Sequence, residues 1–476
     1  MQSEDKPSIQ DIYRHRRQFG VNLGAAFVGE KWIADRLYTC APGGVSSELS
    51  AVRAYVGVHG LSRAQQEWEN HWGTWFSDHD VTYLSDHKIN SVRIPLGFFS
   101  LSEPALLADT AFLDYAQVYK NCWNYVEAII NKCAAAGIGV LLDLHCLQGG
   151  QNKDVHCGMD NSTAAFFSEE RHQRMALDSV KLLLSKASSF TNIVGVQAMN
   201  EPVWGREDIL YPFYSACLEH AYSVGNVPLY IGDGWNLNLW SKWVGERDQF
   251  CIVDHHYYYC FTEGDHKRSP ADHIRQIKQS TELAQCSELA GGNIVIGEWS
   301  LALDSSSKQL VRADDLSQLR HEFATVQANK YTADIGGCYF WTYKFQVRNN
   351  NNEWDLRDMI DSGSIQSPLR APFKLDHSTL RHEFDNHSSR KMNEHCHYWQ
   401  SRGEYFEHWR YEEGFALAWN DVLCFADADS EIGYIGEWKK KRRAAHVRDR
   451  GHSDYIWEFD TGYAAGFVAA TKVLEA

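Results

Sequence analysis

The chain contains 476 residues, of which 44% are hydrophobic and 23% are charged. This composition excludes a disordered chain, a collagen and a coiled coil, and it provides enough apolar surface for a large core. Lys and Arg number 46 against 62 Asp and Glu, which gives a net charge of −16 at pH 7. Because an acidic surface repels phosphate backbones and anionic lipids, we expect neither nucleic acid nor a membrane surface as partner.

The N-terminus lacks the apolar run of about 7–15 residues that marks a secretory signal. No stretch approaches the ~18 apolar residues of a transmembrane helix, so we expect no integral membrane segment. The 12 cysteines are scattered and form no CxxC pair. We therefore expect reduced thiols and a cytoplasmic location, or secretion if a leader is missing from the sequence. The pairs His145-Cys146 and His156-Cys157 lack the spacing of a structural zinc site, so we expect no metal.

Eight short apolar runs recur along the chain, separated by stretches long enough for helices such as Tyr115–Ala136 and Ser168–Ser188. The runs cover residues 19–23, 91–96, 139–144, 193–199, 228–231, 250–253, 294–296 and 335–340. Continuous β-branched runs are typical of strands buried on both faces of a parallel sheet. The alternation predicts an α/β fold, a (β/α)8 TIM barrel with a C-terminal helical extension, although periodicity alone also allows a doubly wound open sheet.

The sequence changes character after about residue 365. We predict an N-terminal tail over residues 1–14, a catalytic barrel over 15–365, and a C-terminal helical layer over 366–476 that packs on the barrel. In this layer, 414–419 (GFALAW) and 462–467 (GYAAGF) alternate small and aromatic residues, which predicts helices that approach closely and could form an oligomer interface. The basic run 439–443 (KKKRR) is typical of a solvated helix face rather than a nucleic-acid patch.

Polar residues follow the apolar runs, where a TIM barrel places its active groups. They are Arg93, Asp143, His145, Asn200, Glu201, Asp254, His255, His256, Tyr257, Tyr258, Glu298 and Trp341. Glu201 and Glu298, after the fourth and seventh runs, would project into one mouth of the barrel. Such a carboxylate pair is what glycoside hydrolysis requires. The aromatic content of 13% fits either core packing or a groove for sugar rings.

An ordered set of motifs covers roughly residues 15–360. These motifs are GVNLG (20–24), HWGTWFSDHD (71–80), INSVRIPLGFF (89–99), LLDLH (141–145), MNEP (199–202), DHHYY (254–258), IGEW (296–299) and YFWTYK (339–344). The set resembles glycoside hydrolase family 5, within the clan of retaining barrel enzymes, and is most similar to its fungal exo-β-1,3-glucanase branch. A second IGEW at 435–438 has no preceding strand, so Glu437 is given no catalytic role.

The resemblance implies that Glu201 is the catalytic acid/base and Glu298 the catalytic nucleophile. A retaining pair would lie about 5–5.5 Å apart, and Glu201 would have a raised pKa relative to Glu298. The adjacent Arg93 would keep Glu298 ionised. The resemblance also implies a set of residues that bind substrate or position the carboxylates. These are Glu30, Arg93, His145, Asn200, His256, Tyr258, Phe261 and Trp341. No cofactor is needed.

Departures from the branch lie on the leaving-group side of the site. LLDLHCLQGGQN replaces LLDLHGAPGSQN, Asp154 stands near the position of a branch Phe, and WTYKFQ replaces WTWKTE. We therefore expect a retaining glycoside hydrolase that releases glucose from the non-reducing end of a β-glucan or a small β-glucoside. One alternative is an intracellular β-glucosidase acting on a glycolipid, sterol or phenolic glucoside. The other is a catalytically silent carbohydrate-binding or scaffold protein.

Overall fold

A computed structural model describes residues 6–160, 163–349, 351–369, 376–403 and 406–475. Eight parallel strands form a closed barrel in chain order, because β1 pairs with both β2 and β8. The strands are β1 (Gln18–Asn22), β2 (Ser91–Gly97), β3 (Gly139–Cys146), β4 (Ile193–Gln197), β5 (Leu229–Gly232), β6 (Cys251–Tyr257), β7 (Ile294–Trp299) and β8 (Gly337–Phe340). The predicted TIM barrel is confirmed, and the open sheet is excluded.

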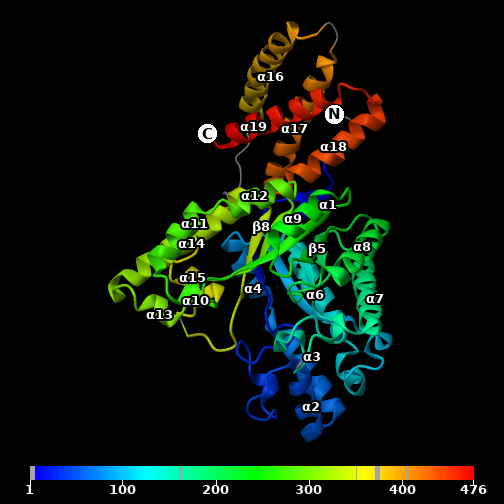
Figure 1. The fold of residues 1–476 in the computed structure, drawn as a ribbon, viewed down its shortest axis with the longest axis vertical. Coiled ribbons are helices and arrows are strands. Elements are labelled where there is room, and N and C mark those ends of the chain that lie inside the picture. The colour runs from blue at the N-terminus through cyan, green and yellow to red at the C-terminus, as the bar shows by residue number, and fades with distance from the viewer. Residues whose placement is uncertain (1–5, 161–162, 350, 370–375, 404–405, 476) are drawn as a thin grey trace. The chain divides into compact units, whose positions relative to one another are not determined.

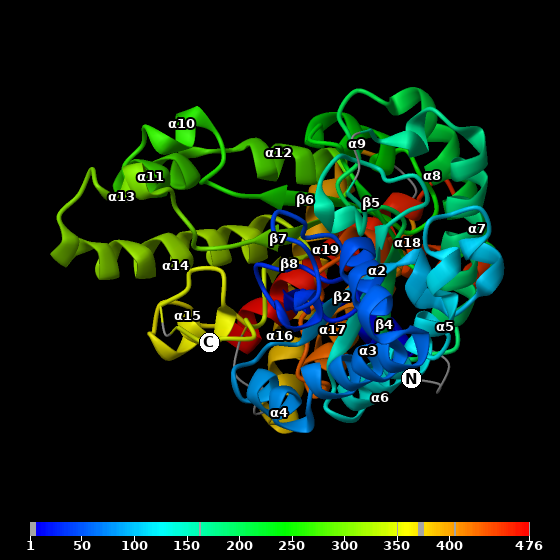
Figure 2. The same ribbon diagram turned by 90° about the horizontal axis from the view of Figure 1, so that it is seen from below.

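The strands are buried along their length, apart from two half-buried positions on β6. Helices surround the barrel, and α11 and α14 pack side by side on each other and project beyond the strands (Figures 1 and 2). The barrel helices are α2 (Glu48–His59), α3 (Leu61–Trp75), α4 (Asp78–Asp86), α5 (Ala116–Tyr119), α6 (Cys122–Ala135), α7 (Glu170–Ala187), α8 (Glu207–Ser223), α9 (Leu237–Gly245), α10 (Glu263–His266), α11 (Pro270–Gln279), α12 (Glu282–Leu289), α13 (Ser305–Lys308), α14 (Leu316–Asp334) and α15 (Leu356–Asp361). Burial of each strand between the barrel interior and these helices explains the continuous apolar runs.

The chain divides into two compact units, one spanning residues 18–369 and the other joining residues up to 17 with those from 370 onward. The second unit contains α1 (Ile9–His15), α16 (His377–Gln400), α17 (His408–Asp427), α18 (Ile435–Arg450) and α19 (Ile456–Glu475). The N-terminal segment is therefore not a plain tail. Ser8 and Asp11 form a capping box that starts α1, and Ile12 joins the hydrophobic core of this unit. Residues 1–5 of the predicted tail lie outside the described residues.

Helices α17 and α19 cross at glycines. A Cβ atom on Gly414 would lie 2.4 Å from the carbonyl oxygen of Phe459, and one on Gly462 would lie 2.0 Å from that of Tyr411. Backbone therefore packs against backbone, with aromatic side chains on either side of the contact. The close approach predicted from the alternation of small and aromatic residues is confirmed.

The basic run lies on α18, but its face is not fully solvated. Arg442 is buried, and its Nη2 lies 2.5 Å from Oδ1 of the buried Asp421. Glu437 also lies on α18, in the unit that does not contain the barrel, which agrees with its exclusion from catalysis. None of the described helices combines the length and apolar character needed to cross a bilayer.

Candidate active site

Two glutamates meet at the carboxyl ends of the strands. Glu298 lies in β7, and Glu201 lies in the turn that follows β4. A carboxylate oxygen of Glu201 and one of Glu298 lie within 4.8 Å of each other, and His256 of β6 is within the same distance of both. This spacing suits a pair in which one carboxylate attacks the sugar directly, and it is shorter than the roughly 6.5–9.5 Å of enzymes that fit a water between sugar and base.

Glu298 is held on both of its oxygens. Arg93 Nη1 donates to Oε1 at 2.9 Å, and the Tyr258 hydroxyl donates to Oε2 at 2.7 Å. The preceding Gly297 is required by packing, since a Cβ atom there would lie 2.0 Å from Oδ1 of Asp254. The carboxylate is therefore fixed in orientation by two donors.

Arg93 is fully buried in β2, and each of its three nitrogens has a partner. Nε donates to Gln197 at 2.9 Å, and Nη1 donates to Asn22 at 2.8 Å as well as to Glu298. Nη2 donates to Asn200 Oδ1 at 2.8 Å and lies 3.0 Å from Asp143 Oδ2. Although burial alone disfavours a charged guanidinium, the surrounding carboxylates raise the pKa of Arg93. From β2, the planar guanidinium thus holds together side chains of β1, β3, β4 and β7 and of the turn after β4.

Glu201 shares a short hydrogen bond with His256, whose Nδ1 lies 2.6 Å from Oε1. Burial raises the pKa of Glu201, but the hydrogen bond and positive charge of His256 outweigh it and lower the pKa to about 2. The pKa of His256 is raised well above its usual value, because the charges of Glu298 and Asp254 outweigh its burial. This direction is the opposite of the raised pKa expected for Glu201. The pair keeps one proton, and it resides on the imidazole.

The turn after β4 places Glu201 in a strained backbone conformation, with φ at +42°. Two consecutive amides stabilise this turn. Gln151 Nε2 donates to the carbonyl oxygens of His145 and Asn200, both at 2.8 Å, and Asn152 Nδ2 donates to that of Glu201 at 2.9 Å. These two residues close the GGQN string that follows β3.

The predicted −1 side is assembled around β3. His145 Nδ1 lies 2.6 Å from Asp143 Oδ2, and burial lowers the pKa of this imidazole, which favours its neutral form. Trp341 lies parallel to the His145 ring, with centroids 5.8 Å apart. Asn200 Oδ1 accepts a hydrogen bond from Arg93. One N–H of Asn200 Nδ2 faces His145 Nε2 at 3.5 Å, and the other N–H remains available as a donor.

The model of the cellulase family, glycosyl hydrolase family 5, matches residues 56–333. The chain belongs to glycosyl hydrolase family 5. A second family model, described as the glucan 1,3-beta-glucosidase 3 C-terminal domain, matches residues 380–474. The family 5 chain therefore combines the barrel with a C-terminal domain that is itself recognised as a family.

Relatives that span nearly the whole chain agree with this assignment. Glucan 1,3-beta-glucosidase 3 of Schizosaccharomyces pombe is 36% identical, with 96% of each chain covered. An uncharacterized glycosyl hydrolase of Saccharomyces cerevisiae is 28% identical over 96% of this chain and 91% of its own. Among solved structures, rutinosidase from Aspergillus niger aligns with a TM-score of 0.60 at 16% identity, covering 74% of this chain and 98% of its own. That likeness shows the barrel fold.

Aromatic side chains surround the mouth of this family 5 site. Phe261 is 66% exposed and meets the Tyr258 ring edge-on, with centroids 5.4 Å apart. Trp354 contacts both of these rings and also Trp32. Trp204, three residues after Glu201, is 70% exposed. Trp32, Trp204 and Trp354 were not predicted, because their role depends on which loops meet at the mouth.

Glu30 lies buried near the carboxylate pair. Its Oε2 accepts a hydrogen bond from Trp32 Nε1 at 2.9 Å. Burial raises its pKa to about 7, and the nearby charges of Glu298 and Glu201 add to the shift while His156 opposes it. At neutral pH it can therefore offer a sugar hydroxyl either a donor or an acceptor.

His156 is the residue that sequence reasoning missed at the centre of the site. It lies on the loop after β3, and its Nε2 is 3.4 Å from Glu201 Oε2 and 3.0 Å from Asn152 Nδ2. Burial disfavours its charged form, but Cys157 and the charges of Glu201 and Glu30 raise its pKa to about 10. The sequence directed attention to Asp154 in this loop, whereas the side chain against the carboxylate is two residues later.

Glu201, His256 and Glu298 are close enough together to surround a cation. Arg93 already binds Glu298, however, and a permanent guanidinium charge at 2.9 Å disfavours a second cation. The arrangement is suited to proton transfer and nucleophilic attack.

Proposed function

We propose that this enzyme is a retaining β-glucosidase that removes glucose from the non-reducing end of a β-1,3-glucan or of a short β-glucoside. The observation that carries the proposal is the pair of carboxylates within 4.8 Å, with Arg93 and Tyr258 donating to one and His256 to the other. The two glutamates thus have different environments, which is how a site assigns different roles to similar side chains.

In the first step, the carboxylate of Glu298 attacks the anomeric carbon and the glycosidic C–O bond breaks. The leaving oxygen takes a proton from Glu201, and that proton is supplied across the 2.6 Å hydrogen bond from His256. One N–H of Asn200 Nδ2 is directed at His145 Nε2, and the other would donate to the 2-hydroxyl, a contact that strengthens in the transition state. The product is a glucosyl ester on Glu298.

In the second step, Glu201 accepts a proton from water while the water oxygen attacks the anomeric carbon. The ester bond to Glu298 breaks, glucose leaves with its original configuration, and Glu298 returns to its carboxylate form. Tyr258 and Arg93 stabilise the carboxylate as it leaves.

Glucose and the exo mode are supported by the name of the Schizosaccharomyces pombe relative and by Glu30. A buried acid with a pKa of about 7 beside the pair is placed to bind the far hydroxyls of a terminal sugar. Such a contact would close the non-reducing end of the subsite.

The test is incubation with 2-deoxy-2-fluoro-β-glucosyl fluoride, followed by intact mass and peptide mapping. The fluorine destabilises the positively charged transition state, so the glucosyl ester accumulates. We expect one fluoroglucosyl group on Glu298, and none in Glu298→Gln. An adduct with a mannose or galactose analogue instead would overturn the glucosidase proposal while keeping the mechanism. No adduct with any analogue would favour a silent binding protein.

A small apolar aglycone is the second candidate for the leaving group. The exposed ring of Phe261, which packs against Tyr258 beside Glu298, favours it, because flat aromatic surface binds lipid or phenolic groups as well as sugars. Comparing kcat/KM for laminari-oligosaccharides with that for sterol, lipid and phenolic glucosides separates the two substrates. A preference for the latter by an order of magnitude or more would select the apolar aglycone.

We also propose a cytoplasmic location. All 12 cysteines are free thiols, and most of them are buried, as suits a reducing compartment. Fractionation of cells that express the native gene, with detection by antibody, tests this placement. Recovery from the medium or the wall would contradict it.

A further inference from the structure

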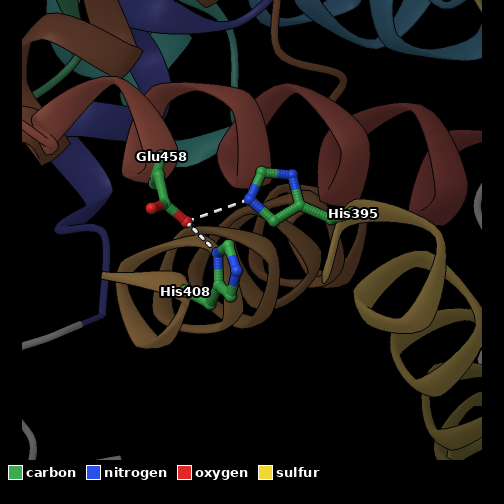
Figure 3. Close-up of side chains that lie close together, drawn as sticks. All are labelled: His395, His408 and Glu458. Atoms are coloured by element: carbon green, nitrogen blue, oxygen red, sulfur yellow. Dashed lines mark hydrogen bonds and ion pairs between the residues drawn. The ribbon is translucent and has the colours of Figure 1, made fainter. Parts of the chain in front are cut away.

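Three side chains converge in the C-terminal unit, outside the catalytic barrel. His395 lies near the end of α16, His408 is the first residue of α17, and Glu458 lies in the first turn of α19. Figure 3 shows both imidazoles pointing at one carboxylate oxygen. His395 Nε2 lies 2.9 Å and His408 Nδ1 lies 2.8 Å from Glu458 Oε2. The consecutive helices α16 and α17 are thus joined to α19 at a single atom.

Among the described residues, no Lys or Arg side chain pairs with Glu458. Its side chain is 0% exposed, and within the described part of the chain its only ion-pair partners are the two histidines. Its other oxygen accepts a hydrogen bond from the backbone N–H of Glu407 at 2.8 Å. A buried carboxylate is costly unless it is paired and hydrogen-bonded, and a divalent cation held by these three side chains would pair it.

The ligand set is one that zinc prefers. Two imidazole nitrogens and one carboxylate oxygen, all within 4.8 Å of one another, form a three-ligand set with room for a fourth ligand. Both rings are held by stacking, His395 on Tyr411 with centroids 4.0 Å apart and His408 on Phe406 at 5.3 Å. Supports of this kind fix the orientation of metal-binding histidines.

We propose that His395, His408 and Glu458 bind one Zn²⁺ ion that ties α16, α17 and α19 together. A cavity of about 410 Å³ is lined by His395, Tyr398, Trp399, Tyr411 and Trp457, among other residues. It offers an entry path for the ion and space for a water molecule as fourth ligand. The ion stabilises the C-terminal unit and takes no part in the reaction at the barrel.

The experiment is metal analysis of the full-length chain, purified without a metal-chelating tag and dialysed against buffer with a trace of ZnCl2. We expect about one zinc per chain. After removal of zinc with EDTA, addition of CoCl2 gives the visible absorption bands of four-coordinate Co²⁺ with a histidine–carboxylate ligand set. EDTA lowers the Tm of the C-terminal unit, and ZnCl2 restores it, because a ligand that binds only the folded state stabilises it.

Three variants locate the ion. His408→Gln, at a partly exposed ligand, loses the zinc and the cobalt bands while keeping its far-ultraviolet circular dichroism. His397→Ala, two residues from His395 on the same helix but exposed, keeps both. Glu298→Gln, in the other cluster, also keeps both. Background zinc with no cobalt bands in the wild-type chain overturns the proposal and leaves a hydrogen-bonded joint. Zinc retained by His408→Gln or lost by Glu298→Gln also overturns it.

Discussion

Arg93 orients the active site because it donates hydrogen bonds to four side chains and forms an ion pair with a fifth. Lysine keeps the charge but has neither the planar fork nor enough donors. We expect Arg93→Lys to lower kcat by about 10²-fold, since a shift of Glu298 by about 1 Å misaligns the attack. Steady-state kinetics measures the loss. The control is Arg206→Lys, at a partly exposed ion pair with Asp208. An unchanged kcat in Arg93→Lys would contradict the orienting role.

The Glu201–His256 pair sets the alkaline limit of activity. Activity needs both groups with one proton between them. Because the pKa of His256 is raised well above that of an ordinary imidazole, the pair keeps this proton at a higher pH. In His256→Gln the proton depends on Glu201 alone, whose carboxylate keeps only His156, 3.4 Å away, as a charged imidazole neighbour and loses the shorter hydrogen bond. That carboxyl loses its proton at lower pH than the pair does. We therefore expect the alkaline limb of kcat/KM to move to lower pH by about one unit or more.

His255→Gln is the matched control for this shift. His255 precedes His256 in β6, but its Nδ1 bonds Asp233 at 2.7 Å and makes no contact with Glu201. Its pH profile should keep the wild-type alkaline limb. A limb that moves equally in both variants, or that stays in place in His256→Gln, would assign the proton to another group.

The acid role of Glu201 is tested through the leaving group. In Glu201→Gln, glycosides with a poor leaving group should lose about 10²–10⁴-fold in kcat/KM, because they need the proton. Dinitrophenyl β-glucoside, whose leaving group needs no proton, should form the glucosyl ester at nearly the wild-type rate. Pre-steady-state release of dinitrophenol measures that step. Equal losses on both substrates would remove Glu201 from the acid role.

At this scale the sequence identified most of the site, for a physical reason. Residues that follow a buried parallel strand must reach the same mouth of the barrel, so Arg93, Glu201, His256 and Glu298 were all predicted to meet there. His156 could not be found in this way, because it lies on a long loop whose path is set by contacts such as that with Asn152. Nor does residue spacing reveal the charge balance that places the shared proton on His256.

At the scale of elements, the contact between α17 and α19 depends on glycine. A Cβ atom on Gly462 would lie only 2.0 Å from the Tyr411 carbonyl oxygen, which is a clash with rigid backbone. We expect Gly462→Ala to force the helices apart and to destabilise the C-terminal unit by about 1–3 kcal/mol. Thermal unfolding monitored by circular dichroism measures the loss.

Gly57→Ala is its control. Gly57 lies within α2, and nothing would meet a Cβ atom there within 4 Å. Alanine is the better helix former, so this change should stabilise α2 by about 0.5–1 kcal/mol. A neutral Gly462→Ala would show that the helices can separate at no cost.

The positions of the strands were predicted more closely than the ends of the helices. All eight strands lie within a few residues of the apolar runs, because a strand buried on both faces has a continuous pattern. The expected helix Tyr115–Ala136 instead divides into α5 and α6, and the expected helix Ser168–Ser188 runs from Glu170 to Ala187. Helix ends depend on caps and tertiary contacts, which hydrophobic periodicity does not encode.

At the scale of the molecule, each unit has a hydrophobic core of its own. The barrel core includes Phe19 through Ile365, and the second core joins Ile12 to residues of α17, α18 and α19. Units with separate cores unfold as separate cooperative steps when each is stable by itself. We therefore expect differential scanning calorimetry to resolve two transitions.

The two transitions can be assigned by changing one unit at a time. The fluoroglucosyl adduct on Glu298 touches only the barrel, so it should raise one Tm and leave the other in place. Gly462→Ala lies only in the C-terminal unit, so it should lower the second Tm and leave the first. Because each perturbation acts on the folded form of a single unit, its effect stays within that unit if the cores are independent. A single transition that both perturbations move, with equal calorimetric and van't Hoff enthalpies, would instead make the chain one cooperative body. In that case, substitutions in the C-terminal helices would lower activity by destabilising the whole chain, including the barrel.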